Sequence, residues 1–310
     1  MVGRRVLIGG AGAALFARFS GFGVTAAAAD APLFRFGIVA DPQYAPAVPD
    51  LKRDRHYSNS LGKLAEAVRA FNREDLAFVA TLGDIIDRSW ESYAHILPIY
   101  DGLTAPRVFL LGNRDHVVAP EYLASLVRNA GMPAAHYDFS GGGWRFVVLD
   151  GNEGGVFAHP PGSAERHAAE ARLAEMAARG APNAAASNGA MGEVQFAWLE
   201  ATLARARDAE EKTIVMGHYP IYPLARPHNQ LDDARLVALL ERFPNVVAYF
   251  NGHDHAGAYA EHAGRHYLNF CGMVQTVASN AFAVVEVWPD RLQVRGFGRE
   301  PSRTLAIAAG

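Results

Sequence analysis

The sequence contains almost no cysteine: Cys271 is the one cysteine among 310 residues. A single thiol excludes an intrachain disulfide framework and a zinc site built on several cysteines. The chain also lacks a basic excess, because its formal net charge is −3 at pH 7, so no nucleic-acid polymer is expected as a partner. With 50% hydrophobic and 20% charged residues, the composition is typical of a globular protein, and the length allows one large α/β domain.

The first residues differ in composition from the rest. Arg4 and Arg5 precede a weakly apolar run rich in glycine and alanine, residues 6–24, and four alanines follow at 26–29. This order predicts a secretory signal, and the paired arginines resemble a twin-arginine export signal. Arg18 inside the run argues against a permanent anchor, so no stable membrane insertion is expected.

We therefore predict that residues 1–29 form a twin-arginine-like export signal and that residues 30–310 form one domain. The protein would then act in the periplasm or outside the cell. An uncleaved anchor and a disordered leader are the alternatives for this segment. If the leader is not functional, the protein would stay in the cytoplasm.

Strand-like and helix-like segments alternate along the remaining chain. Strands are expected at residues 34–40, 77–82, 107–111, 136–140, 144–150, 213–216, 246–250, 266–270, 282–288 and 292–297. Helices are expected at 61–71, at 165–179, from Phe196 onward, and at 236–243. Three glycines at 141–143 predict a hairpin between the two strands beside them. This alternation indicates an α/β fold.

Five of these strands run into polar residues that can bind metal ions. These residues are Asp41 with Gln43, Asp84, Asn113, His218, and His253 with His255. Glycine or proline stands beside each of them and permits a sharp turn. Since sites in open α/β folds lie at the carboxyl ends of strands, we expect one shared cleft.

The predicted ligand set mixes oxygen and nitrogen atoms, which suits manganese, iron or zinc with five or six ligands. Seven ligands are too many for one ion but fit two ions that share a carboxylate, and Asp84 is the natural bridge. Taken singly, Asp41 or Asp84 could cap a helix, Asn113 could serve a turn, and His218 could be a core histidine. The joint pattern favours a two-metal centre for phosphoryl transfer.

The motifs together resemble those of a known family. They are Asp41-x-Gln43, Gly83-Asp84-x-x-Asp87, Gly112-Asn113-x-Asp115, Gly217-His218 and Gly252-His253-x-His255, and they are similar to those of the calcineurin-like metallophosphoesterases. The resemblance implies a calcineurin-like αββα sandwich of two mixed β-sheets flanked by helices. It also implies that one ion is held by Asp41, Gln43, Asp84 and His255. The other ion would be held by Asp84, Asn113, His218 and His253, while Asp87 and Asp115 would orient ligands.

Longer strings resemble one subfamily. Residues 36–41, 83–87, Asn188-Gly189, 220–223 and 288–299 are similar to the manganese-dependent ADP-ribose/CDP-alcohol diphosphatases. This resemblance implies two divalent ions, manganese first and iron or zinc as alternatives. It also implies that a hydroxide between the ions cleaves the diphosphate of nucleoside diphosphate-X substrates.

One position departs from the family pattern. The family usually has a histidine after the motif asparagine, whereas this chain has Arg114. Arginine can stabilise a charged transition state, but it stays protonated and cannot donate a proton. A nucleotide leaving from a diphosphate needs little protonation, so Arg114 fits a diphosphatase better than an alkyl phosphomonoesterase. The predicted catalytic residues are Asp84, Arg114 and His116, with His116 as the candidate acid.

The sequence says less about the organic part of the substrate. Tyr44, Tyr222 and Cys271 are candidate contacts by their places near the motifs, with a purely structural role as the alternative. A monomer acting on a small phosphate or diphosphate is expected. Two other functions stay open: an exported phosphodiesterase or phosphomonoesterase, and a non-catalytic scaffold of the same fold.

Overall fold

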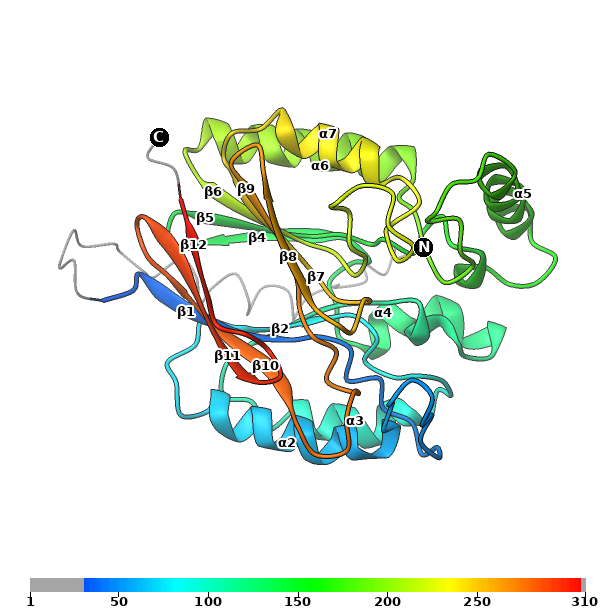
Figure 1. The fold of residues 1–310 in the computed structure, drawn as a ribbon, viewed down its shortest axis with the longest axis horizontal. Helices are drawn as coiled ribbons and strands as arrows, with labels where there is room; N and C mark the ends of the chain where they lie inside the picture. The colour runs from blue at the N-terminus through cyan, green and yellow to red at the C-terminus, as the bar shows by residue number, and fades with distance from the viewer. Residues whose placement is uncertain (1–30, 308–310) are drawn as a thin grey trace, which may run out of the picture.

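The computed structural model describes residues 31–307, and the predicted export signal lies outside them. Two six-stranded β-sheets face each other between two layers of helices (Figure 1). The predicted sandwich of two mixed sheets flanked by helices is therefore confirmed. None of the helices within residues 31–307 is both long and apolar enough to cross a membrane.

The first sheet has the order β12-β11-β10-β1-β2-β3. Its strands are β1 (Phe34–Val39), β2 (Val79–Leu82), β3 (Arg107–Leu110), β10 (Ala281–Val287), β11 (Arg291–Gly298) and β12 (Arg303–Ala306). β1, β2 and β3 run parallel, whereas β10 pairs with β1 in the antiparallel sense. The last strands of the chain thus complete the sheet that the first strand begins.

The second sheet has the order β4-β5-β6-β7-β9-β8. Its strands are β4 (Tyr137–Gly141), β5 (Trp144–Val148), β6 (Lys212–Met216), β7 (Val246–Asn251), β8 (Ala258–His262) and β9 (Arg265–Asn269). β5, β6, β7 and β9 run parallel, and the edge strands β4 and β8 are antiparallel to their neighbours. The hairpin predicted across glycines 141–143 is present as β4 and β5.

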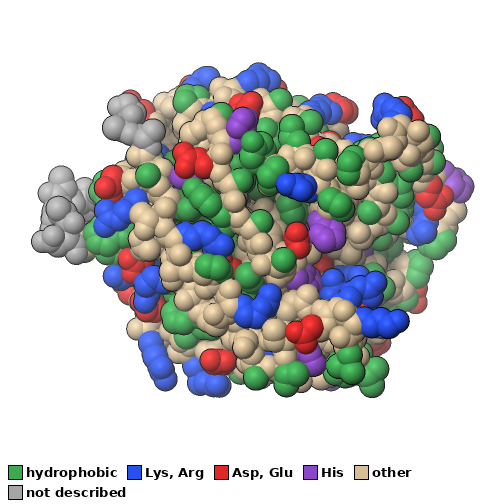
Figure 2. Space-filling model, viewed as in Figure 1, with side chains coloured by type: hydrophobic (Ala, Val, Ile, Leu, Met, Phe, Trp, Pro, Cys, Tyr) green, Lys and Arg blue, Asp and Glu red, His purple; other side chains and the backbone are tan. Residues whose placement is uncertain are grey.

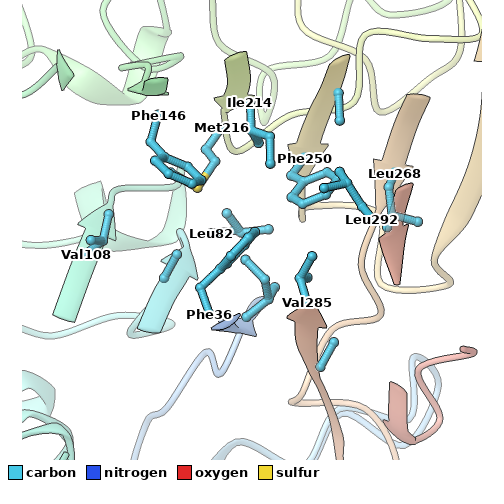
Figure 3. Packing of buried hydrophobic residues seen from close by; sticks show 14 of the residues in the cluster. Phe36, Leu82, Val108, Phe146, Ile214, Met216, Phe250, Leu268, Val285 and Leu292 are labelled. Atoms are coloured by element: carbon cyan, nitrogen blue, oxygen red, sulfur yellow. The ribbon is translucent and has the colours of Figure 1, made fainter. Parts of the chain in front are cut away.

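The main hydrophobic core lies between the two sheets. Phe36 and Leu82 of the first sheet face Phe146, Met216 and Phe250 of the second (Figure 3). The central strands are buried on both faces, because helices cover the outer side of each sheet. Such strands read as continuous apolar runs, which is why the sequence predicted them well.

The helices are α2 (Ser60–Phe71), α3 (Ser92–Tyr100), α4 (Leu126–Asn129), α5 (Ala164–Ala178), α6 (Glu193–Asp208) and α7 (Asp233–Glu241). Short 3₁₀ turns are η1 (Tyr57–Asn59), η2 (Arg114–His116), η3 (Pro120–Ser125) and η4 (Val156–Ala158). α2 and α3 pack on the first sheet, and α6 and α7 pack on the second (Figure 1). α5 stands to one side of both sheets (Figure 1).

Several elements were not predicted from the sequence, among them β8, β12, α3 and the short helix α4. β8 and β12 are edge strands whose side chains are largely exposed, so they carry no alternating apolar signal. α3 contains Pro98, which ordinarily interrupts a helical pattern. Tertiary contacts thus fix these elements where the local pattern is weak.

Candidate metal centre

The strands β1, β2 and β3 of one sheet and β6 and β7 of the other end close together. The loops after them carry two groups of side chains whose ligand atoms all lie within 4.8 Å of one another. The first group is Asp41, Asp84 and His255, and the second is Asp84, His218 and His253. Asp84 belongs to both groups, as the sequence predicted for a bridging ligand.

The two predicted amide ligands adjoin these groups. Gln43 Nε2 lies 2.7 Å from Asp84 Oδ2, while Gln43 Oε1 is buried and has no hydrogen-bond partner among the described residues. Asn113 Oδ1 lies 3.3 Å from His218 Nε2. A buried amide oxygen without a donor is costly, and a divalent cation would satisfy it. The structure therefore brings all seven predicted ligands together.

The backbone is strained at four of the predicted ligands. The φ angles are 47° at Asp41, 45° at Gln43, 49° at Asp84 and 69° at His253, all in the left-handed region that non-glycine residues seldom adopt. Each such residue costs of the order of 1–3 kcal/mol and persists where the surrounding structure fixes it, commonly at functional sites. Here the strain turns four side chains toward a common centre.

Two glycines leave room for ligands that arrive from other loops. A Cβ atom on Gly112 would lie 2.2 Å from Asp84 Oδ1, and one on Gly252 would lie 2.4 Å from Asp41 Oδ2. No real Cβ atom approaches an oxygen so closely. The small residues that flank the predicted ligands are thus needed for close approach as well as for turning the chain.

The electrostatics of the centre suit cations. Burial raises the pKa of Asp41 above its usual value, and the nearby Asp84 carboxylate acts in the same direction. Burial lowers the pKa of His255 to about 3 and that of His253 well below its usual range. Neutral imidazoles beside buried carboxylates are the states that bind metal ions. The donor set fits two divalent ions that share Asp84.

Hydrogen bonds on the far side of two imidazoles decide which nitrogen faces the centre. His218 Nδ1 lies 2.8 Å from the carbonyl oxygen of Leu82, so it donates a proton there and leaves Nε2 free to bind a metal. His253 Nε2 lies 3.1 Å from Asn188 Oδ1. The Asn188 amide nitrogen donates to the carbonyls of Asn183 and Pro227, so its oxygen must face His253. His253 therefore presents Nδ1, which lies 3.2 Å from His218 Nε2.

We expect the substitution Asn188→Leu to weaken the binding of Mn²⁺ by about 10- to 100-fold, the usual effect of removing a partner that orients a metal-bound histidine. The measurement is a calorimetric titration of metal-free protein. Asn183→Leu is the matched control, because Asn183 is also buried and donates to Gln230 but does not contact a histidine in the centre. Equal losses of affinity in both variants would contradict the role of Asn188.

The two predicted orienting carboxylates have different surroundings. Asp115 accepts hydrogen bonds from the backbone nitrogens of Ile86 and Gly112 and from Tyr93, so it braces the loops that carry Asp84 and Asn113. Asp87 is buried and pairs with Arg88 at 2.5 Å. It has no hydrogen bond to a predicted ligand side chain among the described residues, and its orienting role stays a prediction.

Four other predicted site residues do not line the cavity at the centre. His116 contacts the carbonyl of Gly112 through Nδ1 and packs on Phe157, so the structure gives no support to it as the catalytic acid. Tyr44 is buried in the outer core and hydrogen-bonds to His95. Cys271 is buried against backbone carbonyls. Tyr222 lines a neighbouring cavity instead.

The cavity that contains the centre has a volume of about 560 Å³. We call it the metal cavity, and its walls include Arg53, Arg55, Arg114, Arg299 and His228. Figure 2 shows Lys or Arg side chains and histidines gathered on this face of the molecule. Apart from Arg114, the sequence did not single out these cations as site residues, because no strand-end motif marks them. Arg55 and Arg114 have no ion-pair partner among the described residues.

Comparison with known proteins agrees with this geometry. The model of the calcineurin-like phosphoesterase family matches residues 34–257. Manganese-dependent ADP-ribose/CDP-alcohol diphosphatases of Mus musculus and Homo sapiens are each 28% identical to the chain. The alignments cover 89% and 88% of this chain and 94% and 92% of those proteins.

A solved structure of a dimetal phosphatase from Danio rerio superposes with a TM-score of 0.81 at 25% identity, and covers 89% of this chain and 100% of that one. GAP50, the anchor in the inner membrane complex of Plasmodium, superposes with a TM-score of 0.59 at 15% identity. It covers 89% of both chains and shows a shared fold alone.

Proposed function

Because the chain belongs to the calcineurin-like phosphoesterase family, we propose that this metal-dependent phosphoesterase hydrolyses the diphosphate bond of nucleoside diphosphate-X compounds. ADP-ribose and CDP-alcohols are the substrates that the names of its relatives suggest, and manganese is the metal. The seven predicted ligands are proposed to hold two ions, with Asp84 between them. The proposal extends over most of the chain, since the relatives align with 88–89% of it.

The observation that carries the proposal is the cationic wall of the metal cavity. Arg55 and Arg114 line it without a carboxylate partner among the described residues, and the Nε atom of Arg55 is buried and unpaired. An unpaired guanidinium is well suited to phosphate oxygens, which it can bind through two parallel hydrogen bonds. Two such groups beside a two-metal centre match a substrate that carries two phosphates.

The chemistry divides between the metal ions and the protein. When bound, a pair of divalent ions supplies positive charge at phosphorus and lowers the pKa of water to give a nucleophile at neutral pH. The Arg114 guanidinium is placed to balance the charge that develops on the leaving phosphate. His116 is not among the residues that line the metal cavity, so the proposal takes a leaving group that departs as a weak base, as a nucleotide does.

The proposed function is tested by a panel of substrates with the chain from about Asp30 and Mn²⁺. ADP-ribose and CDP-choline are compared with bis(p-nitrophenyl) phosphate and glycerol phosphate. We expect the highest kcat/KM for the two diphosphates. Preference for the diester or monoester would replace the proposal by an exported phosphodiesterase or phosphomonoesterase. Two bound ions without turnover of any substrate would favour the scaffold.

Arg114→His should change the selectivity for leaving groups. A histidine can donate a proton, and general acid catalysis contributes about 10²- to 10⁴-fold where the leaving group is basic. We expect turnover of glycerol phosphate to rise relative to turnover of CDP-choline by about 100-fold. Arg114→Gln, which removes the charge without adding an acid, is the control and should lower both rates. A ratio that stays constant in Arg114→His would remove the argument from the leaving group.

We also propose that residues 1–29 direct export after folding, which rests on Arg4, Arg5 and the composition of the segment. Folding before export would allow metal to be loaded in the cytoplasm. Replacing both arginines by lysine should retain the full-length chain in the cytoplasmic fraction of a cell that has the twin-arginine pathway. Unchanged export of that variant would argue for the general secretory route.

A further inference from the structure

A second cavity of about 480 Å³ adjoins the metal cavity. We call it the tyrosine cavity, and its walls include Pro220, Tyr222, Pro223, Pro227, Ala258 and Tyr267. His228 and Asp254 line both cavities. The His228 ring lies 5.8 Å from the ring of the predicted ligand His253, measured between centroids. The tyrosine cavity therefore begins one side chain away from the metal centre.

The walls of the tyrosine cavity favour a planar ligand. The rings of Tyr222 and Tyr267 have centroids 4.9 Å apart at an angle of 32°. Tyr222 also stacks on His262 at 4.7 Å and 13°, which holds its ring in place. Three prolines add rigid apolar surface. Flat apolar walls of this kind bind aromatic rings by stacking and dispersion.

One wall residue has an unmet hydrogen bond. The Tyr267 residue is only 3% exposed. Its hydroxyl is buried and has no hydrogen-bond partner among the described residues. A buried hydroxyl without a partner is destabilising, so such groups usually meet a protein atom, a water or a ligand. The Tyr267 oxygen is closed off from solvent, so the flat walls and not this hydroxyl favour a ring-shaped ligand.

We propose that the tyrosine cavity binds the nucleobase of the substrate while the diphosphate lies in the metal cavity. This inference rests on the proposed function and names the part of the substrate that the second cavity receives. The His228–Asp254 pair at the junction spans 3.5 Å, and its side chains are 55% and 38% exposed, so the pair is held weakly and can yield to a bound nucleotide. Both cavities have volumes typical of small-molecule sites.

The first test fills the tyrosine cavity. Ala258 lies on the edge strand β8 with an exposed side chain, so Ala258→Trp should occupy the cavity without disturbing the core. We expect KM for ADP-ribose and CDP-choline to rise about tenfold or more, the usual worth of stacking one base. Turnover of P1,P2-dimethyl diphosphate, which has the same bond but no base, should be unchanged. Tyr222→Leu should raise the same KM values by removing the ring.

The matched control fills a cavity elsewhere. Ala238 is exposed on α7 and lines a cavity of about 320 Å³ with Phe196 and Arg235, so Ala238→Trp adds the same ring away from the metal centre. It should leave every KM unchanged. If Ala258→Trp behaves like this control, the tyrosine cavity does not bind the base.

Binding of products separates this inference from the proposed function. AMP and ribose 5-phosphate are titrated into manganese-loaded protein by calorimetry, so no turnover is needed. We expect Ala258→Trp to weaken the binding of AMP about tenfold and to leave the binding of ribose 5-phosphate unchanged. If Ala258→Trp weakened the binding of ribose 5-phosphate alone, the cavity would belong to the other half of the substrate, and the inference would be overturned. If no diphosphate is cleaved but the binding of AMP still depends on the tyrosine cavity, the base site is supported and the proposed function is wrong.

Discussion

Replacing Asp84 by asparagine is expected to lower the turnover of a diphosphate substrate by about 10³-fold or more. Asp84 is the one side chain shared by both groups of ligand atoms, and it also accepts hydrogen bonds from Gln43 and from the backbone nitrogen of Arg114. A catalytic metal ion contributes several kcal/mol to the transition state, and each 1.36 kcal/mol is a factor of ten in rate. Metal content should fall below two ions per chain by elemental analysis.

The same variant should separate function from stability. In metal-free protein, Asp84 adds to the repulsion in a cluster where burial already raises the pKa of Asp41. Asp84→Asn should therefore melt no lower than wild type without metal. Manganese should stabilise wild type in proportion to the ions it binds, but should stabilise the variant little.

Asp208→Asn is the control for the loss of one acidic residue, because Asp208 is exposed and, among residues 31–307, forms an ion pair with its neighbour Arg207 alone. It should keep both ions and full turnover. A variant at Asp84 that retains two tightly bound ions and wild-type turnover would refute the bridging role.

Gly112→Ala is expected to disrupt the centre almost as strongly. The added methyl group would lie 2.2 Å from Asp84 Oδ1 and 2.6 Å from both the Asp84 backbone nitrogen and His218 Cε1. All three of these atoms belong to the predicted ligands Asp84 and His218, so none of them can move far without displacing a ligand. Forcing an extra carbon into a packed interior costs about 1–3 kcal/mol. We expect a lower melting temperature, measured by thermal unfolding, together with at least a 100-fold loss of Mn²⁺ affinity, measured by titration.

Gly62→Ala is the matched control for a glycine-to-alanine change. Gly62 lies within α2, and among the described residues no heavy atom outside its chain neighbours and its own helix backbone comes within 4 Å of an added Cβ. Alanine favours a helix over glycine by roughly 0.5–1 kcal/mol, so this variant should melt slightly higher and bind metal normally. If Gly112→Ala gave the same result, the close approach of Asp84 would not constrain this position.

The fold and the ligands were accessible from the sequence for a specific physical reason. Strands buried on both faces are apolar throughout, so their ends are visible as abrupt changes to polar residues. Parallel strands of one sheet end at one edge, which is why Asp41 and Asp84 could be placed together without coordinates. His253 follows β7 of the second sheet, and the facing of the two sheets brings it to the same place. Edge strands such as β8 were missed, because their exposed side chains follow no apolar pattern.

The limits of sequence reasoning appear at His116 and Asn188. His116 stands two residues beyond Arg114, which suggested a catalytic role, but the 3₁₀ turn η2 (Arg114–His116) directs its ring onto Phe157. Asn188 lies 65 positions from His253, and no spacing rule links them, yet its oxygen orients that imidazole. The spacing of residues along the chain indicated neither the contact between His116 and Phe157 nor the contact between Asn188 and His253.

The sequence alone was enough to predict which side chains would gather as candidate metal ligands, because the polar residues at the strand ends show both the ligand types and their places in the fold. The surroundings of those ligands became visible only in three dimensions. The cationic wall with Arg55 and the stacking of Tyr222 on Tyr267 arise where segments distant in sequence pack side by side. Such contacts depend on the close packing of the whole chain, which no local pattern encodes.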